Sequence, residues 1–258
     1  MSSGGPMHIT SRDNPLLKEL RKLSADSTAY RKAGRFWVEG DHLGRAALAR
    51  GWQPVIAVFA ESVWPTAQEL AQGAGKTVLL PDALFEGISG LESPARMGFV
   101  FDLPQSAGVQ PGEAAVVLDR VQDAGNVGSI LRSAGAFGFR QIIALKGTAA
   151  LWSPKVLRAG MGAHFGLHLV EGAELADLDA LGLPLIVTSS HQGGLIQSQR
   201  LPWPCAWALG HEGQGVGAEL TARSALTVRI GQPGGEESLN VAAAAAICLH
   251  ASAVAAGG

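Results

Sequence analysis

Three segments in the second half of the sequence share one design, in which an apolar stretch is followed by a glycine-rich polar loop and then by a helical pattern. They are VQDAGNVGSILRSAGAFG (121–138), LGHEGQGVGAEL (209–220) and GQPGGEESLNVAAAAA (231–246). Amide, guanidinium, carboxylate and hydroxyl side chains stand at these junctions. In open α/β sheets, ligands bind at the carboxyl ends of the strands, so these groups are candidates for a ligand site.

Each segment taken singly also has a plain structural explanation. Asp123 and Asn126 both offer side chains that could cap the helix, with Asn126 a plain N-cap between glycine turns, and the glycines of residues 210–217 fit turns. Ser238, with Glu236 and Glu237 before it, suits any helix N-terminus, where the helix dipole favours carboxylates. No single segment therefore decides the function.

The elements that must position these segments alternate between strands and helices along the chain. Before residue 105, apolar patterns predict strands at 35–40, 54–60, 76–81 and 98–104, with helices starting at Pro15, at 41–51 and at 65–73. After it, they predict strands at 114–119, 141–147, 166–170, 184–190, 206–210 and 226–231. Helices are predicted at 127–137, 153–163 and 238–253. Continuous apolar strands with helical crossovers indicate an α/β fold with a mostly parallel sheet.

Charge is unevenly distributed along the 258 residues, although the formal net charge is only −2. Residues 1–50 contain nine Lys and Arg against five Asp and Glu, whereas residues 51–110 contain two against six. The basic stretch is open to two interpretations, a solvated helix face or a surface for a polyanion. With 47% apolar and 16% charged residues, the chain can bury a sizeable core.

Cys205 and Cys248 stand apart without metal-ligand spacing, which predicts free thiols in a reduced, cytoplasmic protein. No charged and then apolar leader opens the chain. The longest run of small apolar residues, 241–256, is interrupted by His250 and is too short to span a bilayer. We therefore expect no membrane segment.

Together and in this order, the three segments closely resemble the motifs of the SpoU branch of the SPOUT RNA methyltransferases, the TrmH-like 2′-O-ribose methyltransferases. LDRVQDAGNVGSILRSAGAFG resembles the first motif, WALGHEGQGV the second and ESLNVAAAAAICL the third. WSPKVLRAGMGAHFGL is similar to the segment that follows the second strand in that family. The resemblance runs from about residue 115 to 255 without a break. A looser one, from ITSRDNPLLKELRKL to SPARMGFVF, is to the family's substrate-binding domain.

The resemblance implies two domains. Residues 1–107 would form an RNA substrate-binding domain with an α/β/α fold, and residues 108–258 a SpoU methyltransferase domain with a parallel sheet and a deep trefoil knot. Proline and glycine in residues 104–114 fit a linker. Five alanines at 242–246 would let the last helix approach other backbone closely, as a knot requires. A homodimer formed through the knotted domain is implied as well.

The resemblance also implies the site residues. The catalytic surface would comprise Asn126, Arg132, Glu212, Ser238 and Asn240. The cofactor would be S-adenosylmethionine, held mainly by backbone groups, and the residues implied for it are Leu209, Gly210, Ile230, Ser238 and Leu239. Thr188 and Ser189 are added because they end a strand at the same predicted edge.

The implied reaction moves a methyl group from a sulfonium to a ribose 2′-hydroxyl by in-line displacement. It needs close positioning and a more nucleophilic hydroxyl, and neither a covalent intermediate nor a metal. The family's proposal makes Arg132 the general base. A guanidinium is a poor proton acceptor near neutral pH, so we favour the hypothesis that Arg132 stabilises the developing alkoxide while an RNA phosphate takes the proton.

RNA is implied as the substrate because DNA lacks the 2′-hydroxyl acceptor. The substrate-binding type of N-terminal domain favours ribosomal RNA over transfer RNA. The electrostatic candidates for RNA binding are Arg12, Lys18, Arg21, Lys22, Arg31, Lys32 and Arg35.

Two other functions are alternatives to this one. A dinucleotide-dependent enzyme would need an early G-x-G-x-x-G with an acidic residue about twenty positions later, and the sequence has neither. A knotted RNA-binding or ribosome-assembly factor without catalysis would be expected to lack Arg132 or the pair Ser238 and Asn240. All three are present.

Overall fold

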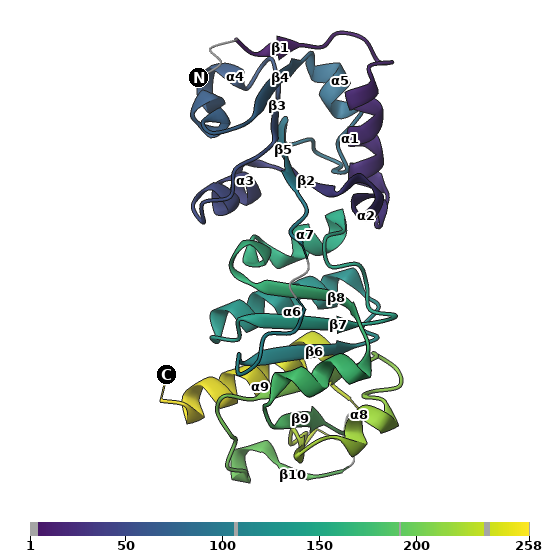
Figure 1. The fold of residues 1–258 in the computed structure, drawn as a ribbon, viewed down its shortest axis with the longest axis vertical. Coiled ribbons are helices and arrows are strands. Elements are labelled where there is room, and N and C mark those ends of the chain that lie inside the picture. The colour runs from purple at the N-terminus through teal and green to yellow at the C-terminus, as the bar shows by residue number, and fades with distance from the viewer. Residues whose placement is uncertain (1–4, 106–107, 191, 235–237, 258) are drawn as a thin grey trace. The chain divides into compact units, whose positions relative to one another are not determined.

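The structure is a computed structural model that describes residues 5–105, 108–190, 192–234 and 238–257 (Figure 1). The chain divides into two compact units. The first comprises the chain up to Gln105 together with Trp152–Phe165, and the second comprises the rest. This differs from the boundary predicted after residue 107, because Trp152–Phe165 packs within the first unit although it follows two strands of the second.

The first unit contains a five-stranded sheet in the order β1-β4-β3-β5-β2. β5 is antiparallel to both of its neighbours, and the other pairs are parallel. In Figure 1 its strands are seen edge-on, with helices on both sides, which confirms the predicted α/β/α arrangement. The strands are β1 (Met7–His8), β2 (Arg35–Glu39), β3 (Ile56–Ala60), β4 (Lys76–Leu80) and β5 (Met97–Asp102). The helices are α1 (Pro15–Ala25), α2 (Ala29–Ala33), α3 (Asp41–Leu48), α4 (Trp64–Ala67), η1 (Gln68–Ala71) and α5 (Asp82–Glu86).

Aromatic side chains explain why Trp152–Phe165 packs in the first unit. This segment contains α7 (Pro154–Gly160) and runs into η2 (Ala163–Gly166). Phe36 on β2 stacks on Phe101 with 5.6 Å between the ring centroids, and Trp152 lies 4.5 Å from Phe36. The indole Nε1 of Trp52 donates a hydrogen bond of 3.1 Å to the carbonyl oxygen of Phe165. Burial of these large rings therefore holds Trp152–Phe165 against the sheet of the first unit.

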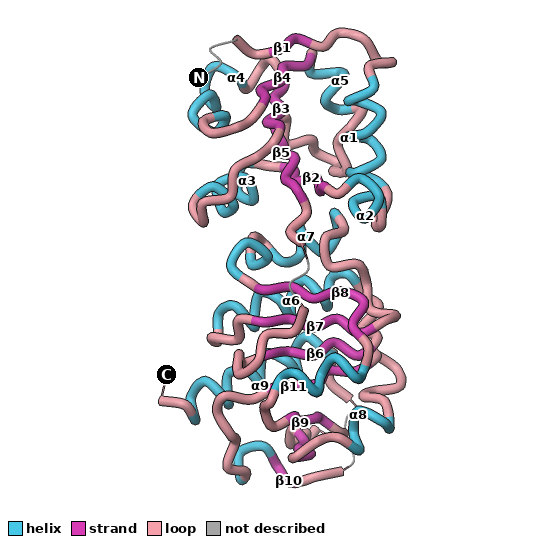
Figure 2. Tube along the Cα trace, in the orientation of Figure 1, coloured by secondary structure: helices cyan, strands magenta, loops and turns pink. Residues whose placement is uncertain are grey.

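The second unit contains a seven-stranded sheet in the order β10-β12-β9-β11-β6-β7-β8, with every pair parallel. This confirms the predicted parallel sheet. Its strands are among the magenta segments of Figure 2. The strands are β6 (Ala115–Asp119), β7 (Gln141–Leu145), β8 (His168–Ala173), β9 (Leu185–Thr188), β10 (Gly194–Leu195), β11 (Ala206–Gly210) and β12 (Leu226–Arg229). The helices are α6 (Ala124–Ala136), η3 (Leu175–Leu181), η4 (Ile196–Ser198), α8 (Ala218–Ala222) and α9 (Val241–Ala255).

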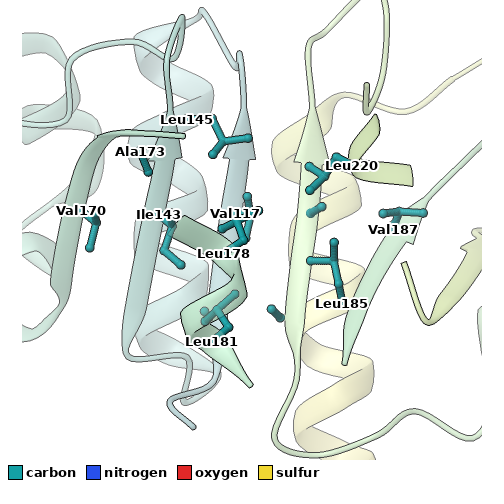
Figure 3. Packing of buried hydrophobic residues seen from close by; sticks show 13 residues of the cluster. Val117, Ile143, Leu145, Val170, Ala173, Leu178, Leu181, Leu185, Val187 and Leu220 are labelled. Carbon is teal, nitrogen blue, oxygen red and sulfur yellow. The ribbon is translucent and has the colours of Figure 1, made fainter. Parts of the chain in front are cut away.

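Both faces of the second sheet are covered, as the continuous apolar strands predicted. Figure 3 shows one face, where Val117, Ile143 and Val187 pack with Leu178 and Leu181 from η3. In that view α6 and α9 lie behind the sheet. α9 is fixed there by a buried hydrogen bond, in which Trp207 Nε1 on β11 donates to Ser252 Oγ at 2.9 Å.

The strand order brings two of the three glycine-rich loops side by side. β11 comes late in the chain but lies between β6 and β9, with Gly210 in register with Asp119 of β6. The loops that follow β6 and β11 therefore leave the sheet at neighbouring positions on its carboxyl edge. The third loop follows β12, and its helix α9 returns to pack against α6 and β11. Among the described residues, no helix is long and apolar enough to cross a membrane.

Candidate active site at the carboxyl edge of the second sheet

Asn126 lies inside α6 and is not its N-cap. The helix begins at Ala124, three residues earlier than predicted, because Asp123 is the cap and its Oδ1 accepts a hydrogen bond of 2.8 Å from the Asn126 backbone N–H. The N-cap interpretation of Asn126 was therefore wrong. Only the backbone N–H of Asn126 takes part in the cap, so its side-chain amide can bond elsewhere.

One chain of hydrogen bonds joins the three motif segments through Asn126, Glu212 and Asn240, which we call the three-motif cluster. Asn126 Nδ2 donates to Glu212 Oε1 at 3.1 Å, and Asn126 Oδ1 accepts from Asn240 Nδ2 at 2.9 Å. The Glu212 carboxylate also accepts the backbone N–H groups of Gln122 at 3.2 Å and Asp123 at 3.0 Å. Asn240 Oδ1 in turn caps α9. The cluster thus fixes the starts of α6 and α9 to the loop after β11.

The hydrogen bonds to Glu212 control its protonation. Partial burial pushes the pKa of this carboxyl up, but the hydrogen bonds from the Asn126 side chain and from backbone N–H groups outweigh it and lower the pKa from its ordinary value of 4.5 to about 2. Glu212 is therefore an anion at neutral pH and too weak a base to accept a proton there. Its chemical role is to hold donors in place.

The depressed pKa of Glu212 predicts how Glu212→Gln changes stability with pH. The anion stabilises the fold fully above pH 4.5, and this contribution is lost as the pH falls toward about 2. We expect Glu212→Gln to unfold at a lower temperature than the wild type near pH 7, with the difference vanishing near pH 2. Thermal unfolding from pH 2 to 7 measures this. A difference that does not change with pH would contradict the assignment.

A second network of hydrogen bonds, which was not predicted from the sequence, stabilises the loop that contains Glu212. The buried carboxylate of Asp119, at the end of β6, accepts the Gly217 backbone N–H at 2.7 Å and the Arg120 guanidinium at 2.9 and 3.2 Å. This pairing also raises the pKa of Arg120. Arg120 Nη1 donates to Gln214 Oε1 at 3.0 Å. The position of Asp119 at a strand end was the one available signal, whereas nothing in the sequence marks Arg120, whose φ is +59°.

Arg132 and Ser238 are accessible from solvent. Arg132 lies on α6 six residues after Asn126, and no described residue forms a hydrogen bond or ion pair with its guanidinium. Ser238 is exposed in the loop that leads to Asn240. The structure therefore brings Asn126, Glu212 and Asn240 into contact and leaves Arg132 and Ser238 open to a ligand.

The predicted cofactor residues occupy the carboxyl ends of three adjacent strands. Leu209 and Gly210 end β11, Thr188 ends β9 with Ser189 after it, and Ile230 follows β12. The Ser189 backbone N–H donates to the carbonyl oxygen of Val228 at 2.9 Å, so it is already used. The Leu239 side chain is 39% exposed, which is unusual for its type. Apolar side chains beside backbone groups of glycine-rich turns fit a nucleoside-type cofactor.

A groove of about 560 Å³ lies elsewhere in this unit, along α9. Phe137, Ile247 and His250 line it, together with Ile230. None of the catalytic candidates does. Of the described residues predicted for the site, Ile230 alone lines this groove. The described residues contain no group of three or more His, Cys, Asp and Glu that could hold a metal ion.

Comparison with known proteins identifies the family. Residues 113–250 match the SpoU rRNA Methylase family, and residues 14–97 match the MRM3-like substrate binding domain. The chain belongs to the SpoU rRNA methylase family. This SpoU methylase is 31% identical over 246 residues to the 23S rRNA (guanosine(2553)-2′-O)-methyltransferase RlmP of Bacillus subtilis, a match that covers 94% of the chain and 97% of the relative.

Solved structures show the same fold over nearly the whole SpoU methylase. An AdoMet-bound rRNA methyltransferase from Sinorhizobium meliloti has a TM-score of 0.84 at 27% identity, covering 96% of this chain and 98% of that one. An RNA 2′-O ribose methyltransferase has a TM-score of 0.81 at 28% identity, covering 98% of this chain and all of that one. These matches confirm the predicted family, the α/β fold with its parallel sheet, and S-adenosylmethionine as the cofactor.

The basic candidates lie on α1, on α2, at the start of β2 and in the turn before α1. Several have partners within the first unit. Arg21 donates to the carbonyl oxygens of Gly87 and Arg12, and Lys18 lies 3.5 Å from Asp13. Arg35 lies 3.7 Å from Glu19. Lys22 and Lys32 are exposed, so the basic surface remains accessible.

Proposed function

We propose that this SpoU methylase transfers the methyl group of S-adenosylmethionine to a ribose 2′-hydroxyl of ribosomal RNA. The three-motif cluster carries the proposal, because it joins the three motif segments into one polar surface beside the strand ends. The names of two relatives support an rRNA substrate. They are the 23S rRNA methyltransferase RlmP of Bacillus subtilis and the human mitochondrial rRNA methyltransferase 3.

Each residue has a defined task in this reaction. When bound, S-adenosylmethionine supplies an electrophilic methyl group on a sulfonium. Arg132 stabilises the negative charge that develops on the 2′-oxygen, and the proton leaves to an RNA phosphate. Asn126 and Asn240 orient the nucleotide, with Glu212 holding Asn126 in place. Ser238 arranges the loop before α9.

The cofactor would be held by Leu209, Gly210, Ile230 and Leu239, with Thr188, Ser189 and Ser238 completing the edge. A trefoil knot at this edge is part of the proposal. Two features support it: β11 is inserted between β9 and β6, and α9 returns from β12 to pack on α6. The first residues of α9, Val241–Ala246, have small side chains, which would let this helix lie close to the backbone of other segments, as a knot requires.

The experiment that tests the function combines cofactor binding with mapping of the product. Calorimetric titration with S-adenosylmethionine should show binding, and ribose methylation mapped across total RNA should lose one or few sites when the gene is deleted. Binding of RNA without binding of the cofactor would reject catalysis and favour a non-catalytic assembly factor. Loss of a methyl group from transfer RNA alone would reject the ribosomal substrate.

We propose that the first unit is the RNA-binding domain, and its basic residues predict a salt dependence. Each phosphate contact adds about 0.7 to 0.9 to the slope of log affinity against log salt. The double variant Lys22→Gln, Lys32→Gln should reduce that slope by about 1.5 in fluorescence titrations with RNA, whereas Lys76→Gln on β4 should leave it unchanged. Equal slopes in the double variant and the wild type would remove these lysines from the RNA surface.

We further propose a homodimer formed through α9. This helix has no Asp, Glu, Lys or Arg, and its apolar residues Ile247 and Val254 are 41% and 55% exposed, with Ile247 lining the groove. An apolar helix that is exposed on one side is typical of a protein interface.

The homodimer predicts that Ile247→Lys lowers the molar mass measured by light scattering from twice that of the chain toward a single chain, because burying an unpaired ammonium is costly. Ala222→Lys on α8, also exposed, is the matched control and should stay dimeric. A wild-type protein that is monomeric at micromolar concentration would refute the dimer.

A cytoplasmic location remains our proposal from the cysteines. Both are buried free thiols, and burial raises the pKa of Cys205 to about 11 and that of Cys248 to about 12. Thiols that stay protonated react slowly, so these side chains serve packing.

A further inference from the structure

The strand edge that we propose for the cofactor contains one polar atom with no partner. Oε1 of Gln232 is buried, and no described residue donates a hydrogen bond to it. Buried amide oxygens are nearly always hydrogen-bonded in folded proteins, because an oxygen removed from water without a partner loses its hydrogen bonds. The oxygen is therefore placed for a donor that the described chain does not supply.

The position of Gln232 limits what that donor can be. It lies three residues beyond the end of β12, between Ile230 and Leu239 in sequence. The neighbouring strand β9 ends beside β12, where the Ser189 backbone N–H is bonded to Val228. Gln232 is thus on the loop proposed to hold the cofactor, although it was absent from the residues predicted to do so.

The chemistry of an amide selects one part of the cofactor. S-adenosylmethionine offers three kinds of donor, which are the adenine amine, the ribose hydroxyls and the ammonium. The ammonium is best matched by a carboxylate, whereas a neutral amide matches the flat, uncharged adenine, which carries a donor and an acceptor side by side. Glutamine pairs with adenine through two hydrogen bonds, accepting from the 6-amino group and donating to an adjacent ring nitrogen.

We propose that the side-chain amide of Gln232 is a specificity-determining contact for the adenine of S-adenosylmethionine. The inference rests on the proposed cofactor edge and adds a side chain to a pocket otherwise predicted to bind through backbone groups. It also explains why the buried amide oxygen of Gln232 has no hydrogen-bond donor among the described residues.

Calorimetric binding of two ligands tests the contact without requiring catalysis. The ligands are S-adenosylhomocysteine and its analogue that lacks the 6-amino group of the purine. We expect the wild type to prefer S-adenosylhomocysteine by about tenfold or more. Gln232→Met, similar in length and without hydrogen-bonding groups, should bind both ligands equally and S-adenosylhomocysteine about tenfold more weakly than the wild type does. Gln232→Glu retains acceptor oxygens and should keep a preference for the amine.

The other outcomes are distinct. An unchanged preference for the amine in Gln232→Met overturns the adenine contact, even if its overall affinity falls, because the amide would then face the ribose or the ammonium. Gln72→Met, on the exposed end of η1 in the first unit, is the matched control and should behave as the wild type. A wild-type protein that binds neither ligand would instead refute the proposed cofactor site. Circular dichroism of each variant confirms that it is folded.

Discussion

Replacement of Arg132 by alanine is expected to abolish detectable methylation, a loss of at least about 10²-fold in rate, while the affinity for S-adenosylmethionine stays within about twofold of the wild type. The reason is geometric and electrostatic. Arg132 is exposed on α6 and bonds to no described residue, so its removal leaves the cluster of Asn126, Glu212 and Asn240 intact. In the proposed mechanism it takes away the cation that stabilises the charge on the ribose oxygen, and removing a single such donor typically costs 10²- to 10³-fold.

Two variants make the Arg132 result specific. Arg132→Lys keeps the charge without the planar fork and should recover part of the rate, which would separate charge stabilisation from geometry. Arg140→Ala removes another exposed arginine of the same unit and should methylate normally. Methyl transfer is measured with labelled cofactor on RNA, and binding by calorimetry. If Arg132→Ala retained most of its activity, the role assigned to Arg132 would be withdrawn.

The sequence predicted the elements and the grouping of the motifs well, because both depend on local patterns. The apolar runs around Val117, Ile143 and Val187 identified buried parallel strands. The two-residue edge strands β1 and β10 escaped prediction, since two residues carry no periodicity. The antiparallel β5 and the packing of Trp152–Phe165 in the first unit were also unpredictable, because they depend on contacts between distant residues.

The three residues of the three-motif cluster were named from the sequence, but the hydrogen bonds between them could not be predicted. Asn126, Glu212 and Asn240 were chosen through a resemblance, and only the strand order explains why they meet. The sequence offered both Asp123 and Asn126 as caps, since both residue types cap helices well, and the structure places Asp123 in that position. Arg120 and Gln232 carry no sequence signal. Arg120 stands out because its guanidinium bonds to Gln214. Gln232 stands out because no described residue donates a hydrogen bond to its buried side-chain oxygen.

Gly210→Ala is expected to disable the same site through the backbone. An added Cβ would lie 2.0 Å from the carbonyl carbon of Gly215 and 2.1 Å from the backbone nitrogen of Val216. Neither atom can move without shifting the 211–217 loop, whose ends are held by the hydrogen bonds between His211 and Gly215 and by Asp119. That shift would carry Glu212 away from Asn126. Overpacking of this kind costs about 1–3 kcal/mol of stability.

Gly213→Ala provides the control within the same loop. Its added Cβ would meet only the His211 ring, at 3.8 Å, which is ordinary contact. We therefore expect Gly210→Ala to lower the melting temperature by several degrees and to weaken cofactor binding at least about tenfold, with methylation lost, while Gly213→Ala stays near the wild type. Because both changes add one methyl group to one loop, equal behaviour of the two variants would show that the close approach at Gly210 does not hold the site together.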